Sequence, residues 1–341
     1  MAIDISKFKS SKVLVIGDLM IDEFIWGAVE TVSREAPVPV VTVQENNFSL
    51  GGAGNVAQNL AAMGAQVSVV GITGTGLNAT TMMDMFNDLG INASGVYSDK
   101  KRDTSKKIRV IASCQQVLQI DRETIKPIST AAESAMIHSI RKILPTVDIV
   151  IASDRGKGAL TRPMLTEIIS LAKNNNIISI VDPYGSNYER YTGATILTPN
   201  AKEVSTETGI KISDRASIFK AGTELLKKTR VEGLLVTCGK DGIVLFGRSA
   251  QPFAIESEAR QVFDVTGARD TMVAVLALSL AAGGSFKDAA TVANVAAGIV
   301  VGKLGTATIS EKEIILELMA FSGNAAPPKD DAIFADKKTL Y

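Results

Sequence analysis

Short, continuous runs of apolar residues recur along the chain, and segments of helix length separate many of them. The apolar runs lie at residues 12–16, 67–70, 148–152, 177–181, 195–197, 233–237 and 242–246. Because these runs are continuous and do not alternate with polar residues, they are typical of strands covered on both faces. The helix-length segments include residues 55–63, 80–89, 131–144 and 162–174. Strands and helices in alternation predict an α/β fold with a mainly parallel sheet and helices on both faces.

Two stretches interrupt this alternation. Residues 24–44 and 107–119 carry β-branched residues in partial alternation, and no helix-length segment divides either stretch. The pattern predicts antiparallel strands outside the main sheet. We therefore expect one domain over residues 1–321, with a small β-sheet lid from about residues 20–46 and 97–121. We expect residues 322–341 to form a polar C-terminal tail.

The composition excludes several classes of protein. Among 341 residues, 36 are basic and 36 are acidic, and this balance argues against binding to nucleic acid. One histidine and two cysteines argue against most zinc sites, against histidine-dependent nucleophilic catalysis and against a disulfide framework. The most apolar segments, residues 271–282 and 289–302, are shorter than the roughly 20 residues that span a bilayer. With no secretory leader visible, we expect a cytoplasmic protein that does not contact a membrane.

A glycine cluster at residues 51–54 stands directly before a predicted helix that begins near Asn55. Glycines at such a place let the backbone approach a ligand closely and present N–H donors to it. Asn55 could then bind a hydroxyl-rich ligand. The alternative interpretation is a tight turn with Asn55 as a helix cap.

A second candidate site lies between Asp264 and Asp270, immediately before the apolar segment that starts at Thr271. Gly267 allows an unusual backbone conformation at a helix N-terminus, where the amides and the helix dipole favour an anion. A carboxylate beside a phosphate site can act as a general base toward an attacking hydroxyl, which makes Asp270 a candidate. The alternative is an acidic residue that only stabilises the start of the helix.

Two further loops follow predicted strands. Asn200 and Glu203 stand at a helix start on the edge of the sheet where α/β proteins bind ligands, and they could hold Mg²⁺ through water. The alternative there is a capping box, with Asn200 as N-cap and Glu203 three positions later. The loop at residues 237–242 could lie along a nucleotide, or it could be an ordinary hairpin connection.

In their order and spacing, these segments resemble one family. The chain resembles the PfkB carbohydrate kinases of the ribokinase-like fold and, within them, the heptose 7-phosphate kinases of ADP-heptose synthesis. The resemblance extends from Lys12 to about Ser310. Its most specific parts are residues 17–22, 33–40, 51–57, 197–200 and 301–306. It implies a three-layer α/β/α sandwich with a β-sheet lid, and an ATP-dependent sugar kinase.

The resemblance also implies roles for individual residues. Asp270 would deprotonate the anomeric hydroxyl of the sugar, and the backbone near Gly267 and Ala268 would line the anion hole for the transferred phosphate. The residues implied for binding the sugar are Asp18, Asp22, Gly51, Gly52 and Asn55. The residues implied for binding its phosphate groups are Lys107, Arg109 and Lys157.

The resemblance also implies residues that bind the metal ions and the nucleotide. Asn200 and Glu203 would organise Mg²⁺, and Asp264 and Thr266 fall where relatives bind a monovalent cation such as K⁺. The residues implied to border ATP are Thr237, Gly239, Gly242 and Asn294. Relatives pair their lids, so we expect a homodimer that covers the apolar residues of the lid, which are Phe24, Ile25, Trp26, Val38 and Val40.

Two positions depart from the pattern of the family. Arg269 replaces the second glycine of Gly-Ala-Gly-Asp at residues 267–270, and Tyr184 replaces the lysine of Asp-Pro-Lys-Gly at residues 182–185. The expected function is phosphorylation of O1 of D-glycero-β-D-manno-heptose 7-phosphate by ATP. Two alternatives stay open: a PfkB kinase for another sugar or sugar phosphate, and a catalytically weak protein that binds a nucleotide or sugar.

Overall fold

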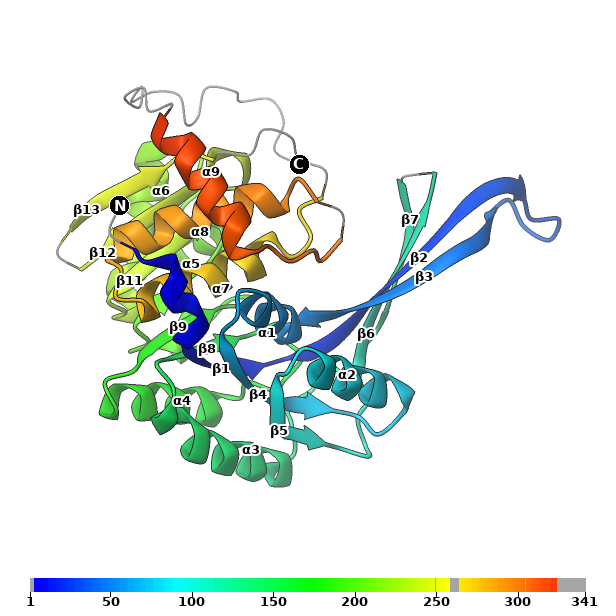
Figure 1. Cartoon of the computed structure of the whole chain (residues 1–341), viewed down its shortest axis with the longest axis horizontal. Helices are drawn as coiled ribbons and strands as arrows, with labels where there is room; N and C mark the ends of the chain where they lie inside the picture. The colour runs from blue at the N-terminus through cyan, green and yellow to red at the C-terminus, as the bar shows by residue number, and fades with distance from the viewer. Residues whose placement is uncertain (1–2, 114, 249, 258–263, 304, 324–341) are drawn as a thin grey trace.

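The computed structural model describes residues 3–113, 115–248, 250–257, 264–303 and 305–323. Within them the chain forms one nine-stranded sheet and one four-stranded sheet (Figure 1). The nine-stranded sheet has the order β13-β12-β11-β10-β9-β8-β1-β4-β5. Its strands are β1 Lys12–Gly17, β4 Gln66–Thr73, β5 Asn92–Ser98, β8 Ile149–Ser153, β9 Ile178–Asp182, β10 Ile196–Leu197, β11 Gly233–Thr237, β12 Ile243–Gly247 and β13 Ala250–Ile255.

All pairs from β5 to β11 in this sheet are parallel, and β12 and β13 continue it as antiparallel strands. The sheet has a hydrophobic core on each of its two faces. Successive side chains of β1 point into these two cores in turn, because side chains alternate between the faces of a strand. Val13 and Val15 join the core on one face, and Leu14 and Ile16 join the core on the other. The continuous apolar runs therefore reflect burial on both faces, as predicted.

Helices cover the two faces of this sheet. On one face lie α1 Ala53–Ala62, α2 Leu77–Asp88, α7 Ala268–Ala281, α8 Phe286–Val300 and α9 Glu311–Gly323. On the other lie α3 Thr130–Ile143, α4 Arg162–Asn174, α5 Ala201–Thr208 and α6 Arg215–Thr229. Short 3₁₀ turns are η1 Ile5–Ser10, η2 Leu144–Thr146, η3 Tyr188–Tyr191 and η4 Gly239–Asp241. The three-layer α/β/α architecture is the predicted one.

The four-stranded sheet, which we call the lid sheet, has the order β3-β2-β6-β7. Its strands are β2 Leu19–Val32, β3 Pro39–Gly52, β6 Ser105–Ala112 and β7 Gln115–Arg122. The long hairpin of β2 and β3 projects away from the sandwich (Figure 1). The predicted strands are present, but β2 and β6 pair in parallel, so the sheet is two antiparallel hairpins joined along a parallel seam.

No helix among the described residues is long and apolar enough to cross a membrane. The segment 271–282 forms most of α7, whose residues from Asp270 to Ser279 are all buried. Its apolar character therefore belongs to the core of the sandwich. Most of the predicted C-terminal tail, from residue 324 onward, lies outside the described residues.

Candidate active site

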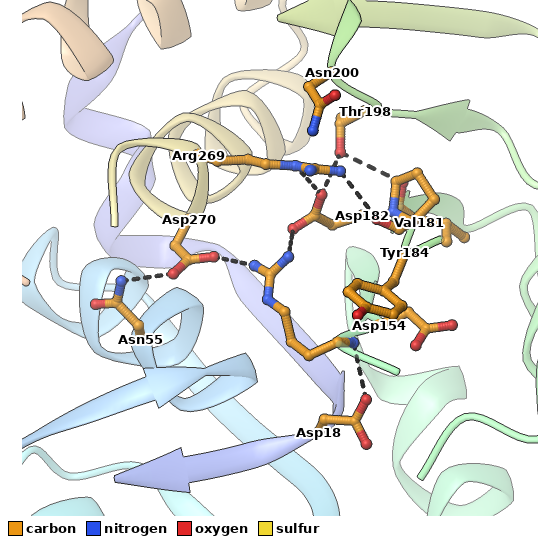
Figure 2. Close-up of polar contacts among 12 residues, drawn as sticks. Asp18, Asn55, Asp154, Val181, Asp182, Tyr184, Thr198, Asn200, Arg269 and Asp270 are labelled. Carbon is orange, nitrogen blue, oxygen red and sulfur yellow. Dashed lines mark hydrogen bonds and ion pairs between the residues drawn. The ribbon is translucent and has the colours of Figure 1, made fainter. Parts of the chain in front are cut away.

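The candidate site lies where the parallel strands end and α7 begins. The loops after β1, β8, β9 and β10 all leave the carboxyl edge of the sheet, because these strands run in the same direction. That edge is where open α/β sheets bind ligands. Figure 2 shows that charged side chains from these loops and from the first turn of α7 point toward one another.

Asp270 lies in the first turn of α7 and is 8% exposed. The helix begins at Gly267, whose φ of 79° lies in the left-handed region that glycine adopts without strain. Asn55 Nδ2 donates to Asp270 Oδ2 at 2.7 Å, and Arg155 Nη2 donates to the other oxygen. Burial raises the pKa of the Asp270 carboxyl, and the guanidinium of Arg155 opposes part of that rise. Asp270 is thus a buried carboxylate with a fixed orientation.

Arg155 links Asp270 to a second carboxylate. It stands in the loop after β8, and its Nη1 lies 2.7 Å from Asp182 Oδ2. The Asp182 side chain is fully buried at the end of β9, where it also accepts a hydrogen bond from Thr198 Oγ1 at 3.2 Å. One guanidinium therefore bridges two buried carboxylates from opposite ends of the site.

Arg269 contacts the same carboxylate from the other side. Its Nε lies 2.5 Å from Asp182 Oδ1, its Nη1 is 3.1 Å from Glu203 Oε1, and its Nη2 donates to the Pro183 carbonyl at 3.1 Å. Burial lowers the pKa of the Arg269 guanidinium, but the carboxylates of Asp182 and Glu203 raise it above its ordinary value. The arginine at the position of the family glycine is therefore held in a fixed place among acidic groups (Figure 2).

Asn200 and Glu203 form a capping box at the start of α5. Asn200 Oδ1 accepts from the Glu203 amide at 2.8 Å, and Glu203 Oε2 accepts from the Asn200 amide at 2.8 Å. The second carboxylate oxygen, Oε1, is the one that Arg269 contacts. The alternative to a metal site is thus present in the structure. The predicted role of this pair toward Mg²⁺ stays a prediction.

Asp18 connects the end of β1 with the loop that carries Arg155. Its Oδ2 accepts from the amides of Arg155 at 2.8 Å and Lys157 at 3.1 Å, and its Oδ1 accepts from Ala159 at 2.9 Å. Three backbone donors converge on one carboxylate, which fixes the loop. The predicted contact of Asp18 with a sugar hydroxyl would add to this structural role.

Gly51 and Gly52 end β3 beside Asp18. Gly52 has a φ of 57°, and a Cβ atom there would lie 2.6 Å from the carbonyl oxygen of Asp18. At Gly51 a Cβ would lie 2.6 Å from Asp22 Oδ2. Both glycines are therefore required by the close approach of β2. They bring Asn55, in the first turn of α1, to within reach of Asp270.

The residues predicted to bind phosphate groups are engaged with carboxylates at the root of the lid sheet. Arg109 Nη1 donates to Asp22 Oδ1 at 2.7 Å. Lys107 Nζ lies 3.0 Å from Glu123 Oε1, and Lys157 Nζ lies 2.5 Å from Glu123 Oε2. Burial alone would lower the pKa of Lys107, but Asp121 and Glu123 raise it. A phosphate at this place would compete with Glu123 for two lysines.

The nucleotide-side residues are spread over several loops. The segment after β11 is a hairpin connection, in which Gly239 and Gly242 have φ values of 60° and 86°. Thr237 ends β11, and Asn294 Nδ2 donates to the Glu256 carbonyl at 2.7 Å. Their contacts with ATP stay predictions.

Asp264 fastens the loop before α7. Its Oδ1 accepts from the Thr266 amide at 2.8 Å, and its Oδ2 accepts from the Gly305 amide at 3.0 Å. In the described part of the chain, no three His, Cys, Asp or Glu residues are grouped as a metal site. The predicted binding of a monovalent cation near Asp264 and Thr266 stays a prediction.

A family model for pfkB family carbohydrate kinases matches residues 10–313 of the chain. The chain belongs to the PfkB family of carbohydrate kinases. This membership confirms the predicted family and enzyme class, an ATP-dependent sugar kinase.

Curated relatives of this PfkB kinase carry the name bifunctional protein HldE. The protein from Desulfatibacillum aliphaticivorans is 48% identical over 92% of the chain and 64% of its own length. The protein from Geobacter metallireducens is 46% identical over 89% of the chain and 62% of its own length. The chain therefore spans slightly less than two thirds of these relatives.

Solved structures confirm the ribokinase-like fold. Arabidopsis thaliana ribokinase, complexed with ribose and ATP, has a TM-score of 0.72 at 20% identity and covers 90% of this chain and 98% of its own. Escherichia coli phosphofructokinase-2, in complex with potassium, has a TM-score of 0.76 at 18% identity. The match covers 92% of this chain and 99% of the phosphofructokinase chain.

Three side chains of this PfkB kinase were not selected from the sequence, although they organise the site. Arg155 and Glu123 are charged residues near the predicted site segments, and Asp182 belongs to the segment 182–185, where the sequence departs from the family pattern at Tyr184. At that missing lysine, Tyr184 is half exposed and its ring packs against Gly156. The available signal was a charged residue at the end of a buried strand for Asp182 and two residues beyond one for Arg155.

Proposed function

We propose that this PfkB kinase transfers the γ-phosphate of ATP to O1 of D-glycero-β-D-manno-heptose 7-phosphate, giving the 1,7-bisphosphate. The relatives named HldE support the heptose class of substrate. The single observation that carries the reaction is the buried carboxylate of Asp270, fixed by Asn55 and Arg155 at the N-terminus of α7.

In this proposal Asp270 accepts the proton of the O1 hydroxyl as that oxygen attacks phosphorus. Each carboxylate oxygen accepts one of these hydrogen bonds and has a second lone pair, which the hydroxyl can use while Arg155 and Asn55 hold the side chain. The first turn of α7 presents amides and the positive end of the helix dipole to the transferred phosphate. Of the two residues implied for the anion hole, Ala268 donates its amide to the Val265 carbonyl at 3.3 Å, so only a small shift would free it.

The 7-phosphate would bind at the root of the lid sheet. Lys107, Arg109 and Lys157 gather there from β6 and from the loop after β8. Their present partners are carboxylates, which a phosphate can replace because it offers the same kind of charged oxygen. The lid sheet would then pack over the sugar and exclude water.

Each alternative also has an observation in its favour. The tyrosine at position 184 removes a lysine from the site, which favours a different sugar phosphate. The contacts of Arg269 with Asp182 and Glu203 fill space beside the base, which favours weak phosphoryl transfer with nucleotide binding retained.

One assay separates these functions. Coupled ADP release is measured with heptose 7-phosphate, with unphosphorylated heptose and with a panel of other sugars and sugar phosphates. We expect turnover with heptose 7-phosphate at a kcat/KM at least about tenfold above that of every other acceptor. ADP release confined to another sugar would overturn the substrate. The absence of release on all acceptors, with ATP binding seen by calorimetry, would establish the weak-transfer alternative.

We further propose that two copies pair through their lid sheets. The β2–β3 hairpin and β7 expose Val32, Val38, Val40, Val43, Val117, Leu118 and Ile120. Apolar side chains gathered on a projecting sheet are typical of a surface that a partner covers. A second copy of the same hairpin offers a matching surface in a two-fold arrangement.

A further inference from the structure

In Figure 2 the side chain of Arg269 extends from the start of α7 to Asp182. Each of its three nitrogens has an oxygen partner: Asp182 for Nε, Glu203 for Nη1 and the Pro183 carbonyl for Nη2. These partners come from the ends of β9 and from α5. The side chain therefore spans the edge of the sheet between the base and the predicted nucleotide side.

A divalent cation does not fit this arrangement of donors. Both oxygens of Asp182 are contacted by arginines, Oδ1 by Arg269 and Oδ2 by Arg155. Both oxygens of Glu203 are also engaged, Oε1 by Arg269 and Oε2 by the amide of Asn200. Magnesium needs near-octahedral oxygen ligands, and here it would have to displace a guanidinium and then lie beside it.

The charges of the cluster define which contacts a bound phosphate would replace. Three carboxylates, from Asp182, Glu203 and Asp270, face two guanidinium groups, from Arg155 and Arg269. A kinase site has to neutralise the phosphates of its nucleotide, and metal ions usually supply that positive charge. The cluster holds one more carboxylate than guanidinium, so a phosphate would be stabilised here by taking over a guanidinium from one of these carboxylates. An arginine does not lose its proton, so its charge remains available for that exchange.

We propose that Arg269 takes the place of the divalent cation and binds the terminal phosphate of the nucleotide. Guanidinium groups pair with phosphate through two parallel hydrogen bonds, and Asp182 and Glu203 hold the group in position until phosphate is present. The inference rests on the proposed function in one respect, namely that a nucleotide binds at this edge of the sheet. Its consequence is that ATP binds to this chain with little dependence on Mg²⁺.

The test measures ATP binding by isothermal titration calorimetry, once with Mg²⁺ and once with a chelator such as EDTA. For the wild-type chain we expect dissociation constants in the two buffers that agree within about threefold. For Arg269→Gly we expect ATP to bind at least about tenfold more weakly with the chelator than with Mg²⁺, because the metal then has to supply the charge. Arg141→Gly is the control, since Arg141 pairs with Glu167 on the surface of α3 and α4.

A second measurement does not depend on the nucleotide. Thermal unfolding is followed with and without Mg²⁺ for the wild type, for Arg269→Gly and for Arg269→Gln, which retains a long side chain and a helix-forming residue. We expect Mg²⁺ to raise the Tm of the two variants and to leave the wild type unchanged, because the vacated carboxylates then accept the ion.

The outcomes are distinct. Wild-type binding of ATP that is lost with the chelator would overturn the role of Arg269 and leave the proposed kinase function standing. Failure of ATP to bind in either buffer would overturn both proposals. If Arg269→Gly does not fold, the wild-type titration alone still decides, since the proposal requires that titration to be insensitive to the chelator.

Discussion

The guanidinium of Arg155 pairs with the carboxylate of Asp270, although the two residues lie 115 positions apart in the chain. Arg155 reaches Asp270 from the loop after β8. The backbone amides of that loop donate to the carboxylate of Asp18, which fixes the loop. The residue proposed as general base therefore meets a permanent positive charge. The pKa of Asp270 therefore depends on two segments that are distant in the chain, the start of α7 and the loop after β8.

Replacing Arg155 with methionine is expected to move the pH dependence of kcat/KM. Burial raises the pKa of Asp270 and Arg155 lowers it, so loss of the guanidinium raises that pKa further. The base works only when ionised, so activity falls as the pH drops through this pKa. The acid limb of the pH profile should therefore shift to higher pH. An acid limb that matches the wild type, or one that also shifts in Arg141→Met, would contradict this account.

Asp270→Asn is expected to lower kcat by about 10²- to 10⁴-fold while the KM for the sugar changes little. The amide has the shape of the carboxylate and keeps a hydrogen bond with Asn55, but it cannot take a proton. Asp288→Asn is a matched control, because Asp288 holds the same first-turn position in α8. Steady-state ADP release measures both variants. Turnover close to wild type in Asp270→Asn would rule out the base.

Glu123→Gln is expected to lower the KM for the sugar phosphate by about three- to tenfold and to leave unphosphorylated sugars unaffected. Glu123 is ion-paired with both Lys107 and Lys157, so its carboxylate competes with an incoming phosphate. Glu167→Gln removes a carboxylate from an exposed ion pair and provides the control. A higher KM in Glu123→Gln would mean that the carboxylate positions the lysines and does not compete with substrate.

The sequence was sufficient for the architecture because strands buried on both faces leave an unmistakable pattern. Runs such as residues 13–16 and 149–152 are apolar at every position, and a sheet covered by helices on both sides buries both faces of such runs. The pairing of β2 with β6 could not be predicted in the same way. An alternating pattern identifies a strand but does not determine its neighbour or its direction.

The site was predictable residue by residue only where a motif is local. Asp270 and Asn55 stand at helix starts, which the sequence marks with glycine. The bridge from Arg155 to Asp182 joins the loop after β8 to the last residue of β9, and these two segments meet only in the folded sheet. For Asn200 and Glu203 one spacing serves two purposes, since a capping box and a pair of metal ligands need the same residues.

Gly52→Ala is expected to destabilise the fold more than Gly209→Ala does. Both glycines have positive φ, at 57° and 70°, so alanine is strained at either position by about 1–3 kcal/mol, and more at Gly52, whose ψ of −129° lies outside the left-handed helical region that Gly209 adopts. A Cβ at Gly209 meets nothing within 4 Å, whereas one at Gly52 lies 2.6 Å from the Asp18 carbonyl oxygen. We expect about 3 kcal/mol or more of lost unfolding free energy for Gly52→Ala in urea titrations. Equal losses in the two variants would show that the contact with Asp18 relaxes easily.

Val43→Lys is expected to convert the proposed dimer into a monomer. Val43 lies on β3 in the projecting hairpin and is 57% exposed, so a charge there would oppose burial against a second copy. Met319→Lys is the control, since Met319 is equally apolar and exposed but belongs to α9. Light scattering gives the mass of each species. A wild-type chain with the mass of one protomer would refute the pairing.

Asp18 connects the main sheet, the lid sheet and the loop that carries Arg155. It is the single residue between β1, in the centre of the main sheet, and β2, which runs outward into the lid sheet. The Asp18 carboxylate also accepts hydrogen bonds from the backbone amides of the loop that carries Arg155. A displacement of the β2–β3 hairpin at its root would therefore be transmitted through Asp18 to that loop. It would reach Arg155, which pairs with Asp270. The position of the lid sheet and the orientation of Asp270 are thus linked through one residue.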